Sequence, residues 1–341
     1  MSNTLNENAS ITSSSILSLG IESTAHTFGV GIVNDKGKVL SNIRYVYRSR
    51  TGIHPREASR FMSRHAVEAL SEALSQASLS LKDLSIISFS RGPGLGPCLR
   101  TGATFARFLS SYLKKPLVGV NHCVAHIEIG RMLTGARDPV ILYLSGGSTQ
   151  VISYLEGVYR IFGETEDIAI GNFIDTFARS AGLSFPGGPI VEELARKGRN
   201  LIDLPYVVKG MNVSFSGLLT YLESLIGKYP IEDLCYSLQE TAFSMLVEVC
   251  ERAMAYLKKD ELLLVGGVGV NTRLREMCRK MCEERGASFY VPPAEFCVDN
   301  GAMIAWNGIL HYTKGDILPV SQSHILTKWR VEDVSVKWWE G

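Results

Sequence analysis

The sequence lacks an excess of charge of either sign. Its 341 residues include 35 Lys and Arg against 34 Asp and Glu, so the formal net charge is +1. A protein that binds nucleic acid through its overall charge is strongly basic, whereas this chain is nearly neutral. An RNA substrate would therefore require a local basic patch or help from partner subunits.

Paired cysteines, long apolar runs and a signal peptide are also missing. The seven cysteines form no CxxC framework, and their odd number favours free thiols in a reducing cytosol. Apolar runs such as 262–265 are far too short to span a bilayer. Residues 1–15 lack a basic start and an apolar core, so we expect a disordered tail there. These absences predict a soluble, cytoplasmic protein.

The chain does contain enough apolar residues for two cores. Hydrophobic residues make up 45% of it and glycines number 32, which favours a loop-rich α/β protein with two lobes. A strand–turn–strand pattern occurs at 16–33 and again at 140–154. Predicted helices cover 55–77, 99–113, 173–181, 190–197, 237–257 and 272–285, and further strands cover 84–90, 117–120 and 261–265. This alternation indicates a duplicated α/β fold.

Two histidines one helical turn apart, His122 and His126, form the most informative motif. Residues i and i+4 lie on one face of a helix, so both rings can bind one metal ion. The spacing alone is more often a coincidence, and a metal site needs a further carboxylate or phenolate. A zinc protease carries Glu directly after its first histidine, whereas this chain has Cys123, which disfavours peptide hydrolysis.

Three turns of small or polar residues are candidates for binding an anion. Without large side chains, several backbone N–H groups can approach a phosphate, although each turn alone could be an ordinary tight turn. The turn at 145–149 and the turn at 22–24 are predicted to face each other as a phosphate clamp. Gly266 and Gly267, with Asn271, follow a strand and precede a helix, where α/β folds often bind nucleotides.

Four other residues have both structural and functional interpretations. Asp299 precedes a helical run and could be its N-cap, although a carboxylate can cap and bind a metal at once. Asp175 could be a solvated helix residue or a partner for ribose hydroxyls. Spacing does not decide between a structural and a binding role for Glu192 either. Tyr143, inside an apolar strand, is most simply a core aromatic.

Taken together, these motifs resemble the archaeal and eukaryotic tRNA threonylcarbamoyladenosine enzymes, the catalytic subunits of the KEOPS complex. Members of this family were once described as O-sialoglycoprotein endopeptidases. The match extends from about Leu17 to Leu310. The motifs that carry it lie at 20–27, 54–57, 92–96, 122–126, 145–147, 163–165, 185–189, 213–217 and 299–303.

The resemblance implies an actin-like, Hsp70-like and sugar-kinase-like (ASKHA) fold, with an adenine nucleotide or threonylcarbamoyl-adenylate in an interlobe cleft. It implies one metal ion, iron or zinc with iron favoured, held by His122, His126, Tyr143 and Asp299. The residues implied to contact the donor are Tyr143, Leu144, Ser145, Gly146, Gly147, Asp175, Gly188, Glu192 and Asn271.

The implied reaction transfers the threonylcarbamoyl group to the exocyclic amine of the adenosine 3′ of the anticodon, in tRNAs reading A-starting codons. No general base is identifiable from the sequence. Besides tRNA, the implied partners are a small protein kinase or ATPase, a regulatory subunit of that kinase, and a small dimer-forming subunit that docks on N-terminal helices. We expect an N-terminal lobe at 16–130 and a C-terminal lobe at 131–341, with the last helix and tail packing back on the first lobe.

The chain departs from the family pattern at a few positions, and two other functions stay open. The departures are Ser148, Gly269, Val270, Val298 and the pair Phe61 and Met62 near the place of a frequent His pair. A metallopeptidase would explain the histidine pair. A nucleotide-binding scaffold without catalytic activity would explain the small-residue turns.

Overall fold

Two five-stranded sheets of the same topology form the framework of the computed structural model, which describes residues 15–49 and 52–339. The first sheet has the order β3-β2-β1-β4-β5 and the second has the order β12-β11-β6-β7-β8. In both, three antiparallel strands continue into two parallel ones. The predicted duplication of an α/β unit is confirmed.

The first sheet comprises β1 (Leu17–Glu22), β2 (Thr27–Asn34), β3 (Val39–Val46), β4 (Ile86–Gly92) and β5 (Leu117–Asn121). The second comprises β6 (Val140–Leu144), β7 (Thr149–Leu155), β8 (Val158–Glu164), β11 (Glu261–Val265) and β12 (Ser288–Tyr290). A short ribbon of β9 (Val208–Lys209) and β10 (Asn212–Val213) lies beside β8.

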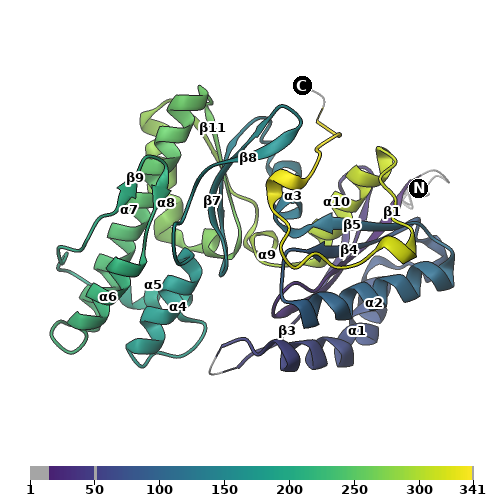
Figure 1. Cartoon of the computed structure of the whole chain (residues 1–341), viewed down its shortest axis with the longest axis horizontal. Helices are drawn as coiled ribbons and strands as arrows, with labels where there is room; N and C mark the ends of the chain where they lie inside the picture. Colours follow the sequence, from purple (N-terminus) through teal and green to yellow (C-terminus); the bar gives the residue numbers. More distant parts are fainter. Residues whose placement is uncertain (1–14, 50–51, 340–341) are drawn as a thin grey trace, which may run out of the picture.

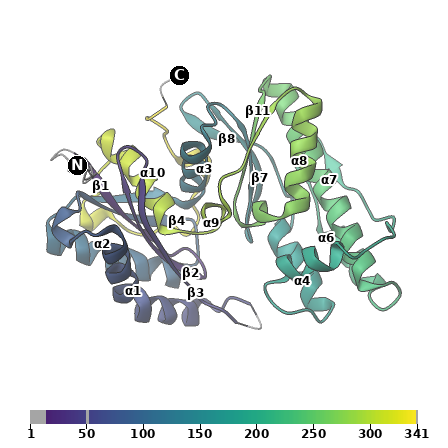
Figure 2. The ribbon, with the colours of Figure 1, turned by 180° about the vertical axis from the view of Figure 1, so that it is seen from behind.

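Helices cover both sheets, as Figures 1 and 2 show from opposite sides. Helices α1 (Pro55–Ala77) and α2 (Gly96–Leu113) pack on one face of the first sheet. Helix α3 (His122–Thr134) connects the sheets and lies between them, beside α10 (Gly301–Thr313). The second lobe carries α4 (Ile170–Ser180), α5 (Gly187–Ala195), α6 (Ser216–Leu225), α7 (Ile231–Leu257) and α8 (Thr272–Glu284), and α9 (Ala294–Cys297) precedes α10.

Helix α10 follows the second lobe in sequence but packs directly on β1 and β2 of the first. Glycines make this close approach possible. A Cβ atom on Gly31 would lie 2.3 Å from the backbone nitrogen of Ala302, and one on Gly20 would lie 2.2 Å from that of Ala305. Because backbone meets backbone here, the position of α10 on the sheet is fixed by main-chain geometry.

The C-terminal residues 318–339, here called the strap, run along both lobes (Figure 1). On the first lobe, the backbone nitrogen of Leu318 donates to Leu117 and that of Leu326 donates to Arg91, each at 2.8 Å. On the second lobe, the nitrogen of Val336 donates to the carbonyl of Gly157 at 2.8 Å. The strap therefore connects the two lobes a third time, after the two connections through α3 and α9–α10.

Aromatic side chains fix the end of the strap around a buried carboxylate, that of Glu128 on α3. Its oxygens accept hydrogen bonds from the Tyr159 hydroxyl at 2.6 Å and the Trp338 indole at 2.8 Å, and Arg131 forms an ion pair with it at 2.9 Å. The Arg131 guanidinium also lies 3.8 Å from the ring centre of Trp339. The charge of Glu128 is thus fully compensated in the interior.

Several expectations from the sequence differ from the structure. The edge strands β3 and β8 are absent from the prediction, and α7 begins at Ile231, six residues earlier than predicted. All seven cysteines are free, as predicted, and all are buried. The predicted tail at 1–15 lies almost entirely outside the described residues. No helix among the described residues is both long and apolar enough to cross a membrane.

Candidate metal centre

The two histidines lie in the first two turns of α3, which begins where β5 ends. Asn121 caps the helix, because its side-chain oxygen accepts hydrogen bonds from the backbone nitrogens of Cys123 at 2.9 Å and Val124 at 3.2 Å. Its amide also donates to the carbonyl of Trp329 in the strap at 3.2 Å. Both His122 and His126 are buried, with 7% and 1% of their surface exposed.

Asp299 lies opposite the histidines because its neighbour takes the capping role. The side chain of Asn300 accepts a hydrogen bond from the backbone nitrogen of Met303 at 2.9 Å, so Asn300 is the N-cap of α10. The interpretation of Asp299 as N-cap is therefore wrong. Its carboxylate instead points to α3.

Three potential ligand atoms converge at this point. The Nε2 atoms of His122 and His126 lie 3.5 and 3.4 Å from the same carboxylate oxygen of Asp299, and all three ligand atoms lie within 4.8 Å of one another. Distances of this length are too long for strong hydrogen bonds. Two imidazoles and one carboxylate form a donor set that suits Fe²⁺ or Zn²⁺, so the residues fit a divalent ion.

The charges of these groups stabilise one another in the buried site. Burial disfavours a charged Asp299, but the hydrogen bond to His126 and the charge of His122 outweigh it and hold the pKa of the carboxyl well below its usual range. Burial likewise opposes protonation of His122, yet the carboxylate of Glu22 raises the pKa of this imidazole to about 9. For His126, burial dominates and lowers the pKa.

Glu22, at the end of β1, orients the first histidine. Its buried carboxylate lies 3.0 Å from His122 Nδ1 and also accepts hydrogen bonds from the backbone nitrogen and hydroxyl of Thr24. The nitrogen of Ser23 donates to the Ser90 hydroxyl at 3.0 Å. The sequence predicted the turn at 22–24 to be one side of a phosphate clamp, whereas the structure shows Glu22 and Thr24 hydrogen-bonded within the chain. The polar groups of this turn are buried and support the metal centre.

Tyr143 on β6 lies beside the histidines, where a role as metal ligand would require it to be. Its ring centre is 5.7 Å from that of His126, and its hydroxyl interacts with the side chains of Ser145 and Cys123. Burial raises the pKa of the Tyr143 phenol and raises that of the Cys123 thiol to about 12. Cys123 is therefore a neutral thiol at ordinary pH and no nucleophile.

The turn after Tyr143 presents unused backbone donors. The nitrogen of Ser145 donates to the carbonyl of Ser148 at 2.8 Å, and the nitrogen of Ser148 donates to the Ser145 hydroxyl at 3.0 Å, which closes the turn. Gly146 and Gly147 are exposed, and their N–H groups have no hydrogen bond within the described chain. Leu144 is buried, so only its backbone could reach a ligand.

The other predicted donor-contacting residues lie in the second lobe, and their side chains already have partners. Asp175 accepts a hydrogen bond from the nitrogen of Gly187 at 2.7 Å, and Glu192 accepts one from the nitrogen of Thr272 at 3.0 Å. Asn271 caps α8 and donates to Gln239 at 2.7 Å. Gly188 has open space where a Cβ atom would be. Thus Asp175, Glu192 and Asn271 are held by hydrogen bonds within the second lobe.

His26 stands in the β1–β2 turn, and the sequence motif that contains it indicates no role for it. The turn that carries it also carries Glu22 and Thr24, which lie 3.0 and 3.4 Å from His122 Nδ1. The Nδ1 atom of His26 is buried and has no hydrogen-bond partner among the described residues. The sequence offers no periodic signal for such a residue, because a turn has no repeating pattern.

Three residues that depart from the family pattern have clear structural surroundings. Met62 is fully buried in α1, and the ring of Phe61 lies 4.5 Å from that of His65 and 5.9 Å from that of Tyr47. A hydrophobic pair therefore suits this helix. A Cβ atom on Gly269 would approach the Leu264 side chain to 3.1 Å, which favours glycine there.

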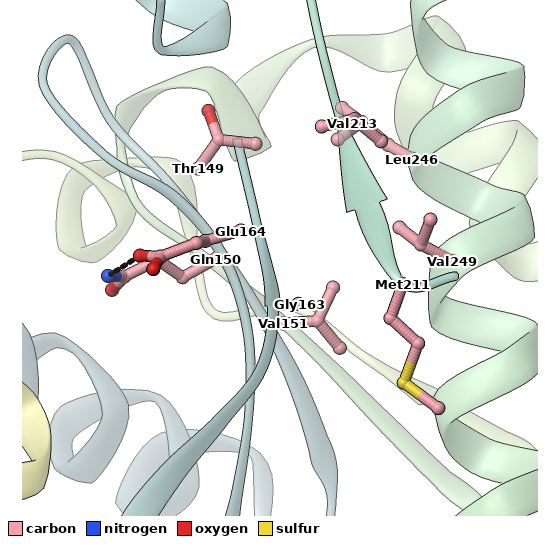
Figure 3. Close-up of a pocket in the computed structure, with 9 residues that line it drawn as sticks. All are labelled: Thr149, Gln150, Val151, Gly163, Glu164, Met211, Val213, Leu246 and Val249. Atoms are coloured by element: carbon pink, nitrogen blue, oxygen red, sulfur yellow. Dashed lines mark hydrogen bonds between the residues drawn. The ribbon is translucent and has the colours of Figure 1, made fainter. Parts of the chain in front are cut away.

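A narrow crevice in the second lobe is shown in Figure 3. It lies between β7, β8, β10 and α7, and its inner wall is apolar, with Val151, Met211 and Val249. Gln150 and Glu164 point away from this wall and contact each other at 3.4 Å. None of its lining residues belongs to the metal centre, and we assign it no ligand.

Comparison with known proteins identifies the family. Residues 38–306 match the family model TsaD, tRNA N6-adenosine threonylcarbamoyltransferase. The chain belongs to this family. A tRNA N6-adenosine threonylcarbamoyltransferase of Thermofilum pendens is 53% identical over 323 residues, covering 94% of this chain and 96% of that protein.

Some relatives in the family are longer. A probable bifunctional tRNA threonylcarbamoyladenosine biosynthesis protein of Methanothermobacter thermautotrophicus is 54% identical over 325 residues. This match covers 95% of the chain but only 61% of the relative. The chain therefore spans about three fifths of that bifunctional protein.

Among solved structures, HypF of T. kodakarensis is similar with a TM-score of 0.62 at 17% identity, over 88% of this chain and 48% of HypF. At this identity the likeness concerns the fold alone. Together with the duplicated sheets, it shows that the predicted ASKHA fold is correct.

Proposed function

We propose that this chain transfers the threonylcarbamoyl group of threonylcarbamoyl-adenylate to the exocyclic amine of the adenosine 3′ of the anticodon, in tRNAs that read codons beginning with A. The observation that carries the proposal is the convergence of His122, His126 and Asp299 in a member of the threonylcarbamoyltransferase family. The duplicated α/β fold supports a nucleotide-based donor, because such folds bind nucleotides at the ends of their strands.

We propose iron as the ion and Tyr143 as a fourth ligand beside His122, His126 and Asp299. Two histidines and one carboxylate are the donor set typical of non-haem Fe²⁺ sites. Tyr143 is adjacent to His126, but its high pKa means that it would lose its proton only on binding. When bound, the ion supplies a Lewis acid that polarises the carbonyl group of the donor.

The adenylate would be bound by the backbone of the turn at 145–147. The unused N–H groups of Gly146 and Gly147 suit a phosphate, because no side chain blocks their approach. Asp175, Gly188, Glu192 and Asn271 would contact the nucleoside part, with their present hydrogen bonds holding them in position. Tyr143, Leu144 and Ser145 complete the proposed donor-contacting set.

The reaction needs no enzyme nucleophile. The N6 amine attacks the carbamoyl carbon, a C–N bond forms, and the bond from that carbon to the phosphate oxygen of the adenylate breaks. AMP leaves with the bonding electrons and the amine loses a proton. Cys123 is a buried neutral thiol, which is consistent with this direct transfer. A zinc peptidase would require a glutamate at this position to act as general base.

The test compares His122→Ala and His126→Ala with His65→Ala, which changes a histidine of α1 that is 31% exposed and lies outside the metal centre. Each protein, with partner subunits, is assayed for threonylcarbamoyladenosine in tRNA supplied with the adenylate. We expect more than about a hundredfold loss for the first two, since loss of an outer partner of a metal ligand alone costs about 10–100-fold. Full activity in both variants would disprove the metal role.

The family resemblance also leads us to propose KEOPS-type partners in the cytoplasm: a small kinase or ATPase, its regulatory subunit and a small dimer-forming subunit. The dimer-forming subunit would bind the far halves of α1 and α2. Val67, Phe108 and Tyr112 are exposed there by 71%, 59% and 69%, and the last two rings stack at 5.8 Å. Phe108→Glu should abolish co-elution with that subunit, and unchanged co-elution would argue against this contact.

A further inference from the structure

Five segments of the first lobe meet next to the metal centre. The Cys98 thiol at the start of α2 contacts the carbonyls of Ala25 at 3.1 Å and Pro55 at 3.6 Å, which joins the β1–β2 turn to the start of α1. The nitrogen of Tyr47, just after β3, donates to the carbonyl of His26 at 2.8 Å. The nitrogen of Gly94 donates to the strap at 3.3 Å. The same β1–β2 turn carries Glu22, the partner of His122.

These segments carry a concentration of exposed positive charge, which we call the basic rim. It consists of Arg48, Arg56, Arg60, Arg100 and Lys328. The only carboxylate exposed among them is that of Glu57, which pairs with Arg60 at 2.9 Å. The other four make no ion pair within the described part of the chain. In a chain with a net charge of only +1, this local excess stands out.

The charges on α1 are placed where they disfavour the helix. Arg56, Arg60 and Arg64 follow one another at intervals of four residues on its exposed face, within its first ten residues. Like charges at this spacing repel, and cations near a helix N-terminus oppose the helix dipole. Helix stability therefore does not explain this pattern, whereas a polyanionic ligand would.

Helices α1 and α2 lie side by side, so their first turns present one surface (Figure 1). The Ser59 and Thr101 hydroxyls join them at 3.0 Å, which keeps Arg60 and Arg100 on neighbouring turns. Arginine suits phosphate, since its planar group donates two parallel hydrogen bonds. The exposed apolar residues of the same helices lie in their second halves, separate from the basic rim.

We propose that the basic rim binds the phosphate backbone of the substrate tRNA beside the reacting adenosine. This inference rests on the proposed function. It identifies the part of a nearly neutral chain that supplies the local positive patch required for RNA. Phosphate contacts there would fix the register of the anticodon loop without reading its bases.

The experiment measures binding of an unmodified tRNA transcript, from a tRNA that reads A-starting codons, to the full chain at a series of salt concentrations. One variant combines Arg48→Glu, Arg56→Glu and Arg100→Glu. The matched control combines Lys36→Glu, Lys82→Glu and Lys280→Glu, which changes the net charge equally. Lys36 and Lys82 lie at the opposite end of the first sheet and Lys280 lies on α8. Circular dichroism and urea unfolding verify that all three proteins fold.

We expect the rim variant to bind tRNA more than about tenfold less tightly than the control. The slope of log K against log salt should fall by about 0.7 for each phosphate that the variant no longer neutralises, or about 2 in total. Equal weakening in both variants would show a nonspecific charge effect and overturn the proposal. Absence of measurable tRNA binding by the unaltered chain at low salt would overturn it too.

Failure of this inference differs from failure of the proposed function. If the unaltered chain with its partners modifies tRNA, but the rim variant binds and modifies it equally well, only the basic rim is disproved. If tRNA binding depends on the rim but no threonylcarbamoyl group is ever transferred, the proposed function fails and the RNA surface stands.

Discussion

The Nδ1 atom of His122 lies 3.0 Å from a carboxylate oxygen of Glu22, although the two residues are 100 positions apart in the sequence. This contact fixes the imidazole ring and directs its Nε2 atom to Asp299. A carboxylate behind a histidine is the usual arrangement of metal-binding imidazoles, since it fixes the tautomer and raises the basicity of the ligand. By contrast, His126 Nδ1 has no partner among the described residues.

Replacing Glu22 by Gln should lower metal affinity by about 10–100-fold, because the ring of His122 loses its charged partner. The measurement is competition with a chelator, followed by metal analysis of the purified protein. Asp316→Asn is the matched control, since it removes the carboxylate 3.2 Å from Nδ1 of His311, outside the site. An equal loss in the control would argue against a specific role for Glu22.

Two neighbouring tryptophans of the strap should differ in their contributions to stability. Trp338→Phe removes a hydrogen bond to the carboxylate of Glu128, which should cost about 1.5–3 kcal/mol. Trp339→Phe removes a bond to the neutral hydroxyl of Tyr159, 3.2 Å away, and should cost about 0.5–1.5 kcal/mol. Urea unfolding gives both values. The reverse order would contradict the account of Glu128 as the centre of this contact.

The free energy of unfolding should decrease in acid as Asp167 becomes protonated. Burial tends to raise its pKa, but hydrogen bonds from the backbone of Phe215 and Ser216 and the hydroxyl of Ser214 hold it well below 3.8. A carboxylate whose pKa is depressed by folding adds stability above its unfolded-state pKa and loses it as the pH falls. Asp167→Asn should therefore be less stable than the parent at pH 6. The difference, measured by urea unfolding, should narrow below about pH 4, and a constant difference would refute this role.

Gly31→Ala should destabilise the protein by about 3 kcal/mol or more, at the upper end of overpacking effects. The added Cβ atom would lie 2.3 Å from the backbone of α10, where nothing flexible can move aside. Gly217→Ala is the control, since no atom lies within 4 Å of its added Cβ in α6. Thermal unfolding of both variants checks the contrast, and similar midpoints would contradict the close packing of α10.

The duplicated framework could be predicted because its buried strands and amphipathic helices leave clear patterns. The prediction of α1 at 55–77 agrees with the structure. Strands β3 and β8 were not predicted because they lie at sheet edges, with mixed burial along their length. Such strands carry neither strict alternation nor a continuous apolar run.

The candidate site was predictable in part. Helical spacing indicated the histidine pair, and the structure places both residues beside Asp299 and Tyr143, whose roles as ligands stay predictions. Adjacent Asp299 and Asn300 are both good N-caps, so the sequence could not tell which of them caps α10. The partnership of Glu22 with His122 depends on how β1 and β5 lie in the sheet, and no local pattern encodes it.

Two of the three passages of the chain between the lobes contribute to the same donor set. His122 and His126 belong to α3, which leads from the first sheet to the second, and Asp299 lies between α9 and α10, which lead back. Rotation of one lobe against the other would pivot about these passages, and atoms near a hinge axis move least. The three donors would therefore keep their mutual distances if one lobe rotated against the other.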